Sequence, residues 1–343
     1  MTGLRAIVVR ALVDADLLLG DRHHERFRSE AFRAGKRLLL RADRSLSDGG
    51  AVSLPAAARS LELSDAALAR MLGFGWYQAD GLAELAATAA ALRPEVARLG
   101  ALFNLGIALF DRVCDRHPER APVLFSRISP EFLEAQLSGR GARLPATGDA
   151  AVDLLVALVE DLFTRSRALG GDAQDQRGFA ELIHAMYRGQ RFSAEVHRDR
   201  AGPTLGTWRE LRRKSALPIA TMAQLALLAQ ADANDRRRAT VRAAASMAGD
   251  AIWIADDLAD IGEDWTAGCW SRPLWILTRR TGSAPADPAS AIAQLVETGV
   301  AAAETQRLAS KLDRLRRIAG TAGAAFSGSL QATVRAWVDE LPE

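Results

Sequence analysis

Apolar residues recur at intervals of three and four along almost every segment longer than ten residues. The segment that begins at Leu154 is an example, since it continues with Leu155, Leu158, Val159 and Leu162. This period places apolar side chains on one face of an α-helix, and no segment sustains the period of two that is typical of a β-strand. Ala, Leu, Arg and Glu dominate these segments, in agreement with helix propensity. We therefore predict an all-α protein.

Residues that favour turns interrupt the helical pattern at several places. Gly, Pro and polar residues gather at positions 45–55, 117–122, 138–148, 170–172, 202–203 and 282–288. The pattern between these breaks predicts helices over residues 4–19, 23–43, 55–71, 80–91, 94–116, 150–169, 177–198, 205–231, 236–262, 289–312 and 318–340.

The domain organisation follows from the absence of any linker. No Ser-, Gly- or Pro-rich stretch divides the 343 residues into parts with separate patterning, although the length alone would allow two domains. No internal repeat has a solenoid period, which disfavours an α-solenoid. We predict one domain over residues 1–343.

Charge and cysteine usage exclude several classes of protein. Lys and Arg number 44 and Asp and Glu 42, so the net charge gives no case for a nucleic-acid partner. The two cysteines, Cys114 and Cys269, fit neither a disulfide framework nor a zinc site, which indicates a reducing compartment. No apolar run approaches the roughly 18 residues of a membrane helix. We expect a cytoplasmic protein with no stable membrane insertion.

A cluster of carboxylates lies in an apolar segment near the end of the helix predicted over 236–262. Asp256 and Asp260 are one helical turn apart, Asp264 is a further turn on, and Asp257 is turned by about 100° from Asp256. The flanking residues, such as Ile254, are apolar, so the segment is unlike an ordinary solvated face. Like charges at this spacing disfavour a helix, and a bound cation would relieve their repulsion.

A second acidic pair, Asp111 and Asp115, has the same spacing and also follows an apolar run. Such a pair by itself is typical of a solvated helix face. Mg²⁺, however, prefers oxygen ligands and commonly binds through one or two carboxylates together with substrate phosphates. Two facing pairs could therefore hold a pyrophosphate group through several metal ions.

The segment from Ile252 to Asp260 resembles the second aspartate-rich motif, Asp-Asp-x-x-Asp, of trans-prenyltransferases. Other segments resemble motifs of the same family and occur in the same order. They are Gly35-Lys36-Arg37-Leu38, the first aspartate-rich motif Asp111-Arg112-Val113-Cys114-Asp115, Arg120, Gly189-Gln190, Lys214-Ser215-Ala216-Leu217 and Arg272-Pro273-Leu274. This order is the reason for identifying a resemblance, because a single aspartate-rich motif occurs in many proteins.

The resemblance implies a class I isoprenoid synthase, a single-domain helical bundle around a central active-site cavity that acts as a homodimer on an allylic prenyl diphosphate. It implies Mg²⁺ ligands at Asp111, Asp115, Asp256, Asp257 and Asp260, and catalytic roles for Asp256, Asp260 and Lys214. It further implies substrate contacts by Lys36, Arg37, Arg120, Gln190, Lys214 and Arg272. Trp253 precedes Asp256 by one turn, so its ring could contact the substrate and stabilise positive charge, or it could pack in the core.

The sequence also departs from the family pattern at positions that concern a second diphosphate. Leu39, Asn104 and Ala121 stand where the chain-elongating members have polar or basic residues, Trp253 replaces a Gln, and Arg112 replaces the second aspartate of the first motif. These changes spare the predicted metal ligands and Lys214. We therefore expect a terpene synthase, in which Mg²⁺ helps pyrophosphate to leave and an allylic cation of the C15–C20 range cyclises or loses a proton.

Two alternatives stay open. A prenyltransferase that condenses the allylic diphosphate with isopentenyl diphosphate, or with another acceptor, would need a second binding site built from other residues. A catalytically silent partner subunit or prenyl-binding scaffold would tolerate Arg112 and the lost donors, although the intact Asp256, Asp257, Asp260 and Lys214 argue against it.

Overall fold

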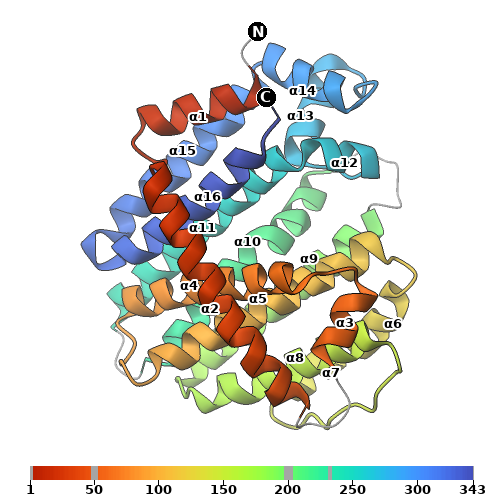
Figure 1. Ribbon diagram of the computed structural model, residues 1–343, viewed down its shortest axis with the longest axis vertical. Helices are drawn as coiled ribbons and strands as arrows, with labels where there is room; N and C mark the ends of the chain where they lie inside the picture. The colour runs from red at the N-terminus through yellow and green to blue at the C-terminus, as the bar shows by residue number, and fades with distance from the viewer. Residues whose placement is uncertain (1–2, 48–52, 197–203, 231–233, 343) are drawn as a thin grey trace. The chain divides into compact units, whose positions relative to one another are not determined.

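The computed structural model describes residues 3–47, 53–196, 204–230 and 234–342, and these residues form helices and connecting segments with no strand. The all-α prediction is confirmed. Figure 1 labels the helices, which run in chain order as follows: α1 (Leu4–Asp14), α2 (Asp21–Ser47), α3 (Leu54–Ser60), α4 (Asp65–Ala86), α5 (Arg93–Arg116), α6 (Ala121–Arg127), α7 (Pro130–Leu137), α8 (Ala150–Ala168), α9 (Ala173–Val196), α10 (Leu205–Leu228), α11 (Asp235–Ala259), α12 (Ile261–Ala267), α13 (Arg272–Thr281), α14 (Pro288–Glu297), α15 (Val300–Ala319) and α16 (Ala324–Glu340).

The chain divides into two compact units. Unit 1 consists of Met1–His24, Met186–Ile219 and Ala243–Glu343, and unit 2 consists of Glu25–Ala185 and Ala220–Arg242. Helices α2, α9, α10 and α11 therefore contribute residues to both. The prediction of a single domain stays a prediction.

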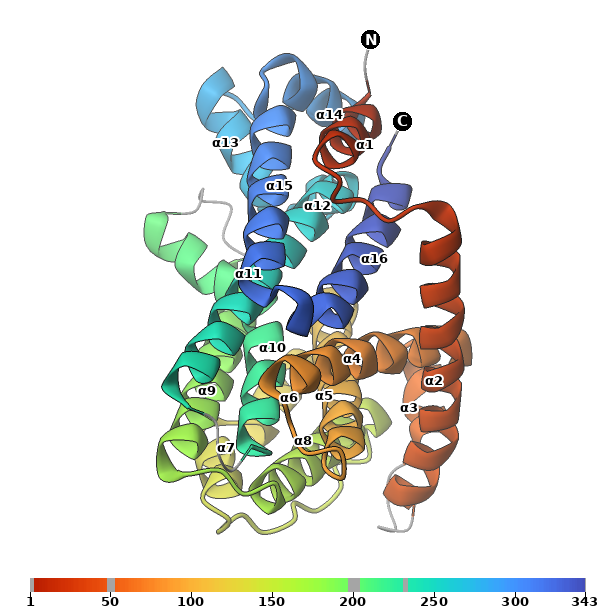
Figure 2. The same cartoon turned by 90° about the vertical axis from the view of Figure 1, so that its left-hand side faces the viewer.

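In unit 1, α15 packs against α16, and α1 contacts both of these helices, as Figures 1 and 2 show. Helices α12, α13 and α14 contact one another, and α13 and α14 also contact α15. The buried residues of α15, among them Leu308, Leu312 and Leu315, recur at three and four, which is the pattern that predicted the helix. The core of unit 1 therefore follows directly from the apolar period.

In unit 2, the helices α4 and α5 pack along each other, and α5 contacts α8. Glycines allow this close approach: a Cβ at Gly75 would lie 2.4 Å from the Gly100 carbonyl oxygen, and one at Gly73 would lie 2.2 Å from the Ala31 carbonyl oxygen of α2. The predicted helices 55–71 and 80–91 were wrong, because α4 continues through these glycines. Packing contacts here outweigh the low helix propensity of Gly.

Other predicted boundaries also change. The short helices α6, α7, α12 and α13 were not predicted, and α6, α7 and α13 each have Pro in the first turn, where its missing N–H costs no hydrogen bond. The predicted helix 289–312 is divided at Gly299, whose φ of 72° lies in the left-handed region. The predicted break at 202–203 lies outside the described residues.

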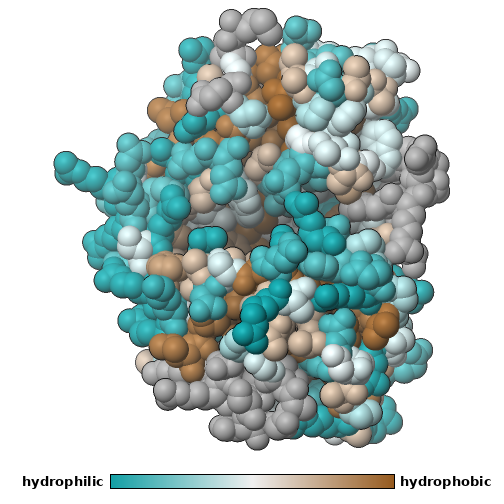
Figure 3. Space-filling model, turned by 45° about the vertical axis from the view of Figure 1, so that its right-hand side comes forward, coloured by the Kyte–Doolittle hydropathy of each residue, from teal (hydrophilic) through white to brown (hydrophobic). Residues whose placement is uncertain are grey.

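The surface mixes polar and apolar side chains, and one face of this surface appears in Figure 3. The large hydrophobic side chains that are exposed among the described residues are Val13, Leu40, Leu92 and Val123, which lie on or next to different helices. Within the described residues, every helix is too short or too polar to cross a membrane.

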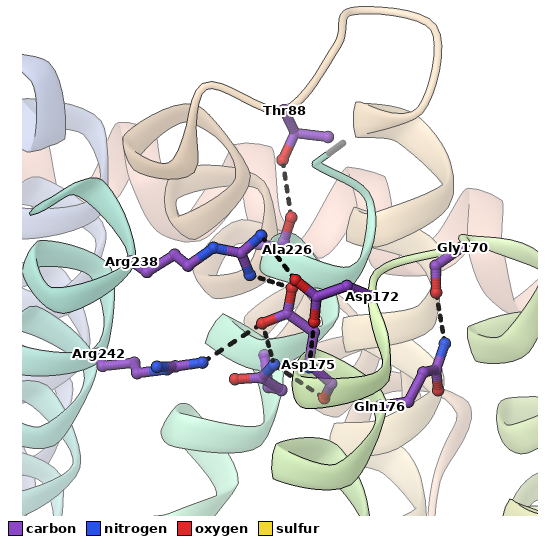
Figure 4. Close-up of polar contacts among 9 residues, drawn as sticks. Thr88, Gly170, Asp172, Asp175, Gln176, Ala226, Arg238 and Arg242 are labelled. Atoms are coloured by element: carbon purple, nitrogen blue, oxygen red, sulfur yellow. Dashed lines mark hydrogen bonds and ion pairs between the residues drawn. The ribbon is translucent and has the colours of Figure 1, made fainter. Parts of the chain in front are cut away.

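A buried ion-pair network in unit 2 joins the starts of α9 and α11 to α10 (Figure 4). Asp175 is fully buried, and its carboxylate pairs with Arg238 and, at 3.3 Å, with Arg242. Gln224 of α10 donates hydrogen bonds of 3.0 and 3.2 Å to the carbonyl and carboxylate oxygens of Asp175. Asp172 accepts the Asp175 backbone N–H at 2.8 Å and adds a contact of 3.4 Å to Arg238. A buried charge with these partners fixes three helix segments together.

Candidate active site

The second aspartate-rich segment lies at the junction of α11 and α12. The predicted helix 236–262 ends earlier, at Ala259, and Asp260 is the N-cap residue of α12, with an exposed side chain that makes no capping hydrogen bond. The one-turn spacing nevertheless persists, because the N–H of Asp260 donates to the Asp256 carbonyl oxygen at 2.9 Å and that of Asp264 donates to Asp260 at 2.8 Å. Asp256 and Asp260 therefore share one side of the chain, as their spacing predicts.

Asp257 faces another direction and contacts the start of α13. One of its carboxylate oxygens accepts the backbone N–H of Arg272 at 3.1 Å. Burial raises the pKa of Asp257 well above its usual range, and the charges of Asp264, Asp256 and Glu304 act in the same direction, whereas the Arg272 N–H opposes them. This partly buried carboxylate therefore lies among like charges.

Two glycines bring α9, α10 and α11 into backbone contact within unit 1. A Cβ at Gly189 of α9 would lie 2.7 Å from the backbone nitrogen of Lys214, and one at Gly249 of α11 would lie 2.1 Å from the Ala216 carbonyl oxygen. The amide nitrogen of Gln190, a residue only 3% exposed, has no hydrogen-bond partner among the described residues. Pro218, four residues after Lys214, cannot donate to the Lys214 carbonyl oxygen and so interrupts the helical ladder.

Helices α10 and α11 run antiparallel along this contact. Gly249 lies against Ala216, and the next residue of α11, Asp250, pairs at 2.6 Å with Arg212, which precedes Ala216 by four residues. Going up the chain in α11 therefore means going down the chain in α10. Lys214 on α10 and Asp256 on α11 thus lie on the same side of the closest approach. The fold places these two predicted catalytic residues at the same end of the crossing.

Trp253 packs in an aromatic cluster of unit 1. It is 6% exposed and lies with Trp208 and Leu211 of α10, while Trp270 and Trp275 pack against this group. The rings of Trp208 and Trp275 meet edge to face at 5.4 Å. Sequence reasoning identified Trp253 but missed the other members, because the cluster forms only when α10, α11 and α13 meet.

The side chain of Arg272 is directed to a buried carboxylate. Its guanidinium lies 3.5 Å from Glu304 of α15, and Glu304 also pairs with Arg307. Burial lowers the pKa of Arg272, and the Glu304 charge opposes this shift. Glu304 was not predicted, and no motif marks it in the sequence.

The first aspartate-rich segment lies near the end of α5, in unit 2. Asp111 is partly buried and Asp115 is exposed. Arg112 turns to another helix, because its Nε donates to the carbonyl oxygen of Leu61, the C-cap residue of α3, at 3.2 Å. Orphan carbonyls at a helix C-terminus favour such a cation. The partner of Arg112 is therefore a backbone carbonyl of another helix and not a carboxylate of the motif.

The remaining predicted cations also lie in unit 2. Lys36 and Arg37 are exposed on α2, with the Lys36 ammonium 4.7 Å above the Phe32 ring. The preceding Gly35 is explained by packing, since a Cβ there would lie 1.8 Å from the Ala69 carbonyl oxygen. Arg120 donates to Ser60 at 3.3 Å and lies 3.6 Å from Asp149.

Unit 1 thus holds Gln190, Lys214, Trp253, Asp256, Asp257, Asp260 and Arg272, and unit 2 holds Lys36, Arg37, Asp111, Asp115 and Arg120. Within the described ranges, no group of three or more His, Cys, Asp or Glu side chains is arranged to hold a metal ion by itself.

No protein-family model matches the sequence, and no curated protein matches it. Solved structures are similar over most of the chain. A geranylgeranyl pyrophosphate synthase from Lactobacillus brevis has a TM-score of 0.60 at 16% identity and covers 88% of this chain and 96% of its own. A polyprenyl synthase from Caulobacter crescentus, complexed with calcium and isoprenyl diphosphate, has a TM-score of 0.55 at 16% identity over 88% and 97%. A linalool/nerolidol synthase from Streptomyces clavuligerus has a TM-score of 0.51 at 18% identity over 88% and 94%.

These similarities show that the chain has the fold of the class I isoprenoid synthases. The predicted fold class is confirmed at this level. At such low identity the comparison concerns the fold, and the activity has to be argued from the chain's own residues.

Proposed function

We propose that this protein is a class I terpene synthase that ionises an allylic prenyl diphosphate of the C15–C20 range with the help of Mg²⁺. The observation that carries the proposal is the glycine-mediated contact of α9, α10 and α11. In this contact Lys214 and Asp256 lie on the same side of the closest approach, and the amide nitrogen of Gln190, next to Gly189, has no hydrogen-bond partner among the described residues. Cation, amide donor and carboxylates are the groups that a metal-bound diphosphate requires.

The residues of α11 and α12 fit a divalent cation. Asp256 and Asp260 offer hard oxygen donors one turn apart, and the crowding of carboxylates around Asp257 is relieved by added positive charge. Mg²⁺ keeps several waters and takes the rest of its ligands from phosphates, so a set of three protein ligands is not needed in advance. Asp111 and Asp115 are proposed as further Mg²⁺ ligands, because they belong to the segment that resembles the first aspartate-rich motif.

In this mechanism, the bound Mg²⁺ would act as a Lewis acid on the diphosphate oxygens. Lys214 and Gln190 would donate hydrogen bonds to the leaving diphosphate as negative charge develops on it, which stabilises the transition state more than the ground state. Trp253 and its aromatic neighbours would exclude water from the allylic cation, and an aromatic face stabilises a cation by about 0.5–2 kcal/mol. The cation, before or after ring closure, would then lose a proton to give a neutral product, and the released pyrophosphate is a base that could take this proton.

Residues in unit 2 favour ionisation over condensation. Asn104, at a position where chain-elongating members carry a donor, uses its amide to donate to the Met71 carbonyl oxygen at 2.9 Å. Ala121, at another such position, is a buried apolar residue with 2% exposure. Arg120 is held between Ser60 and Asp149. These contacts leave fewer groups for a second diphosphate, although the retained Lys36, Arg37 and Arg120 keep the condensing prenyltransferase as the second candidate.

An incubation of purified protein with Mg²⁺ tests the proposal. Geranyl, farnesyl and geranylgeranyl diphosphate are each supplied with and without isopentenyl diphosphate, and pyrophosphate and organic products are measured. Terpene products formed without isopentenyl diphosphate support the proposal. A longer diphosphate formed only in its presence would instead indicate the condensing enzyme, and no pyrophosphate release under any condition would indicate a catalytically silent subunit.

The homodimer and the cytoplasmic location belong to the same proposal. The homodimer follows from the resemblance to prenyltransferases, and the location from the cysteine usage and from the lack of apolar runs. Light scattering coupled to gel filtration would measure the mass of the assembly against the 36.9 kDa chain.

A further inference from the structure

Glu304 is a buried carboxylate that the proposed reaction does not use. It is only 2% exposed, on the face of α15 that belongs to the core of unit 1. Two guanidinium groups compensate its charge: Arg307 lies one turn later on the same helix, and Arg272 lies on α13 at 3.5 Å. Burying a carboxylate costs desolvation free energy, which its cationic partners only partly repay. The other contacts that these partners make are therefore informative.

Arg272 connects Glu304 to the second aspartate-rich segment. Its side chain reaches Glu304, and its backbone N–H donates to the Asp257 carboxylate at 3.1 Å. Arg272 is the first residue of α13, so the positive end of that helix also faces Asp257. One residue thus contacts both carboxylates, Glu304 with its side chain and Asp257 with its backbone.

A separate ion pair joins α11 to α15 directly. Lys311 of α15 pairs with Asp250 of α11 at 2.7 Å. Lys311 follows Glu304 by about two helical turns, and Asp257 follows Asp250 by the same interval, so each pair lies on one face of its helix. The face of α11 that carries Asp257 is thus tied at two points, whereas Asp256 points about 100° away from it.

We propose that Glu304 is a positioning residue for metal binding, which it assists by holding Arg272 so that the start of α13 fixes the carboxylate of Asp257 next to Asp256. The inference rests on the proposed function. In it, Arg272 acts through its backbone N–H and its ion pair, and it does not contact the diphosphate with its guanidinium. A direct partner of a metal ligand, as Arg272 is of Asp257, typically changes metal affinity about 10- to 100-fold when it is mutated, and Glu304 acts one step further out, through Arg272.

The test uses Mg²⁺ with inorganic pyrophosphate as the probe and the rise in Tm of the full-length protein as the readout. Glu304→Gln keeps the shape of the side chain and removes its charge. The Mg²⁺ concentration that gives half of the Tm rise should increase about 10-fold in this variant. Glu297→Gln, an exposed carboxylate at the end of α14, is the matched control and should behave like the wild type.

Arg272→Ala gives an independent measurement, because Glu304 keeps Arg307 in this variant and the core retains one ion pair. It should raise the Mg²⁺ concentration for half of the Tm rise as Glu304→Gln does. The double variant should show no further increase, since both changes break the same ion pair between Arg272 and Glu304. In turnover assays at saturating Mg²⁺, the KM for the allylic diphosphate should change less than about twofold and kcat should recover.

The possible outcomes are distinct. A wild-type protein that shows no Tm rise with Mg²⁺ and pyrophosphate would overturn the proposed function and this inference with it. A normal wild-type response combined with an unchanged Mg²⁺ dependence in Glu304→Gln and Arg272→Ala would overturn the inference alone. If Glu304→Gln does not fold, Arg272→Ala decides by the same criterion. A large rise in KM for Arg272→Ala at saturating Mg²⁺ would show that its guanidinium binds the diphosphate directly, which also contradicts the inference.

Discussion

Gly249 of α11 faces the carbonyl oxygen of Ala216 in α10 at a distance that leaves no room for a side chain. A Cβ at Gly249 would lie 2.1 Å from that oxygen. The atoms that a Cβ at Gly249 would meet all belong to the backbone of Ala216, so the clash cannot be relieved by turning a side chain. The separation of α10 and α11, and with it the placement of Lys214 relative to Asp256, depends on this glycine.

We expect Gly249→Ala to lower the free energy of unfolding by about 1–3 kcal/mol, as overpacking does, and to reduce turnover. The matched control is Gly328→Ala in α16, where a Cβ would meet no atom within 4 Å. This control should raise the free energy of unfolding by about 0.5–1 kcal/mol, because Ala is the better helix former. Urea unfolding followed by circular dichroism measures both, and a rise in both variants would contradict the packing argument.

The buried network of unit 2 leads to a second prediction. Asp175→Asn removes the charge that compensates Arg238, so the free energy of unfolding should fall by about 3–5 kcal/mol. Arg242→Ala removes a half-exposed partner at 3.3 Å and should cost less than about 1 kcal/mol. Chemical denaturation of both variants checks this ranking; equal losses would mean that the burial of Asp175 is not what makes the network important.

The helical part of the fold could be predicted from the sequence because it depends on local spacing. Period and propensity identified α5 and α8 closely, since their apolar residues recur at three and four without interruption, whereas the helix predicted over 318–340 begins six residues before α16. Prediction failed at α4, because the predicted helices 55–71 and 80–91 leave out residues 72–79, which contain Gly73 and Gly75. Their function is to let other helices approach, and this becomes visible only when those helices are in place.

The residues of the candidate site also differ in whether the sequence alone could identify them. That Asp256 and Asp260 share one side of the chain could be predicted because they are one helical turn apart, and Lys214 is proposed as a site residue because it belongs to a short motif. Glu304 and Trp208 could not be found, because their contacts join segments far apart in the sequence. The direction of Arg112 was equally out of reach, since it depends on a carbonyl oxygen of α3.

Arg112 gives a third prediction. Its hydrogen bond to Leu61 stabilises the end of α3, so Arg112→Ala should lower the free energy of unfolding by about 1 kcal/mol. Because its partner is not a carboxylate of the motif, the Mg²⁺ concentration for half-maximal turnover should stay within about twofold of wild type. The control is Arg70→Ala, an exposed arginine on α4, whose effect on stability should be within about 0.5 kcal/mol. A variant that needs much less Mg²⁺ would show that Arg112 occupies the place of a metal ion.

The last prediction concerns Asp256 itself. Asp256→Ala should reduce Mg²⁺-dependent pyrophosphate release by about 100-fold or more, because a group that stabilises developing charge is lost. Its helical circular dichroism should not change, since a like-charge pair one turn apart disfavours the helix by only about 0.2–0.5 kcal/mol. Asp235→Ala provides the control, because this aspartate also lies on α11 but in the exposed first turn. Turnover should be normal in the control and lower by about 100-fold or more in Asp256→Ala, with the Tm rise caused by Mg²⁺ and pyrophosphate lost in parallel. Normal turnover in Asp256→Ala would reject the assignment of Asp256 as a metal ligand.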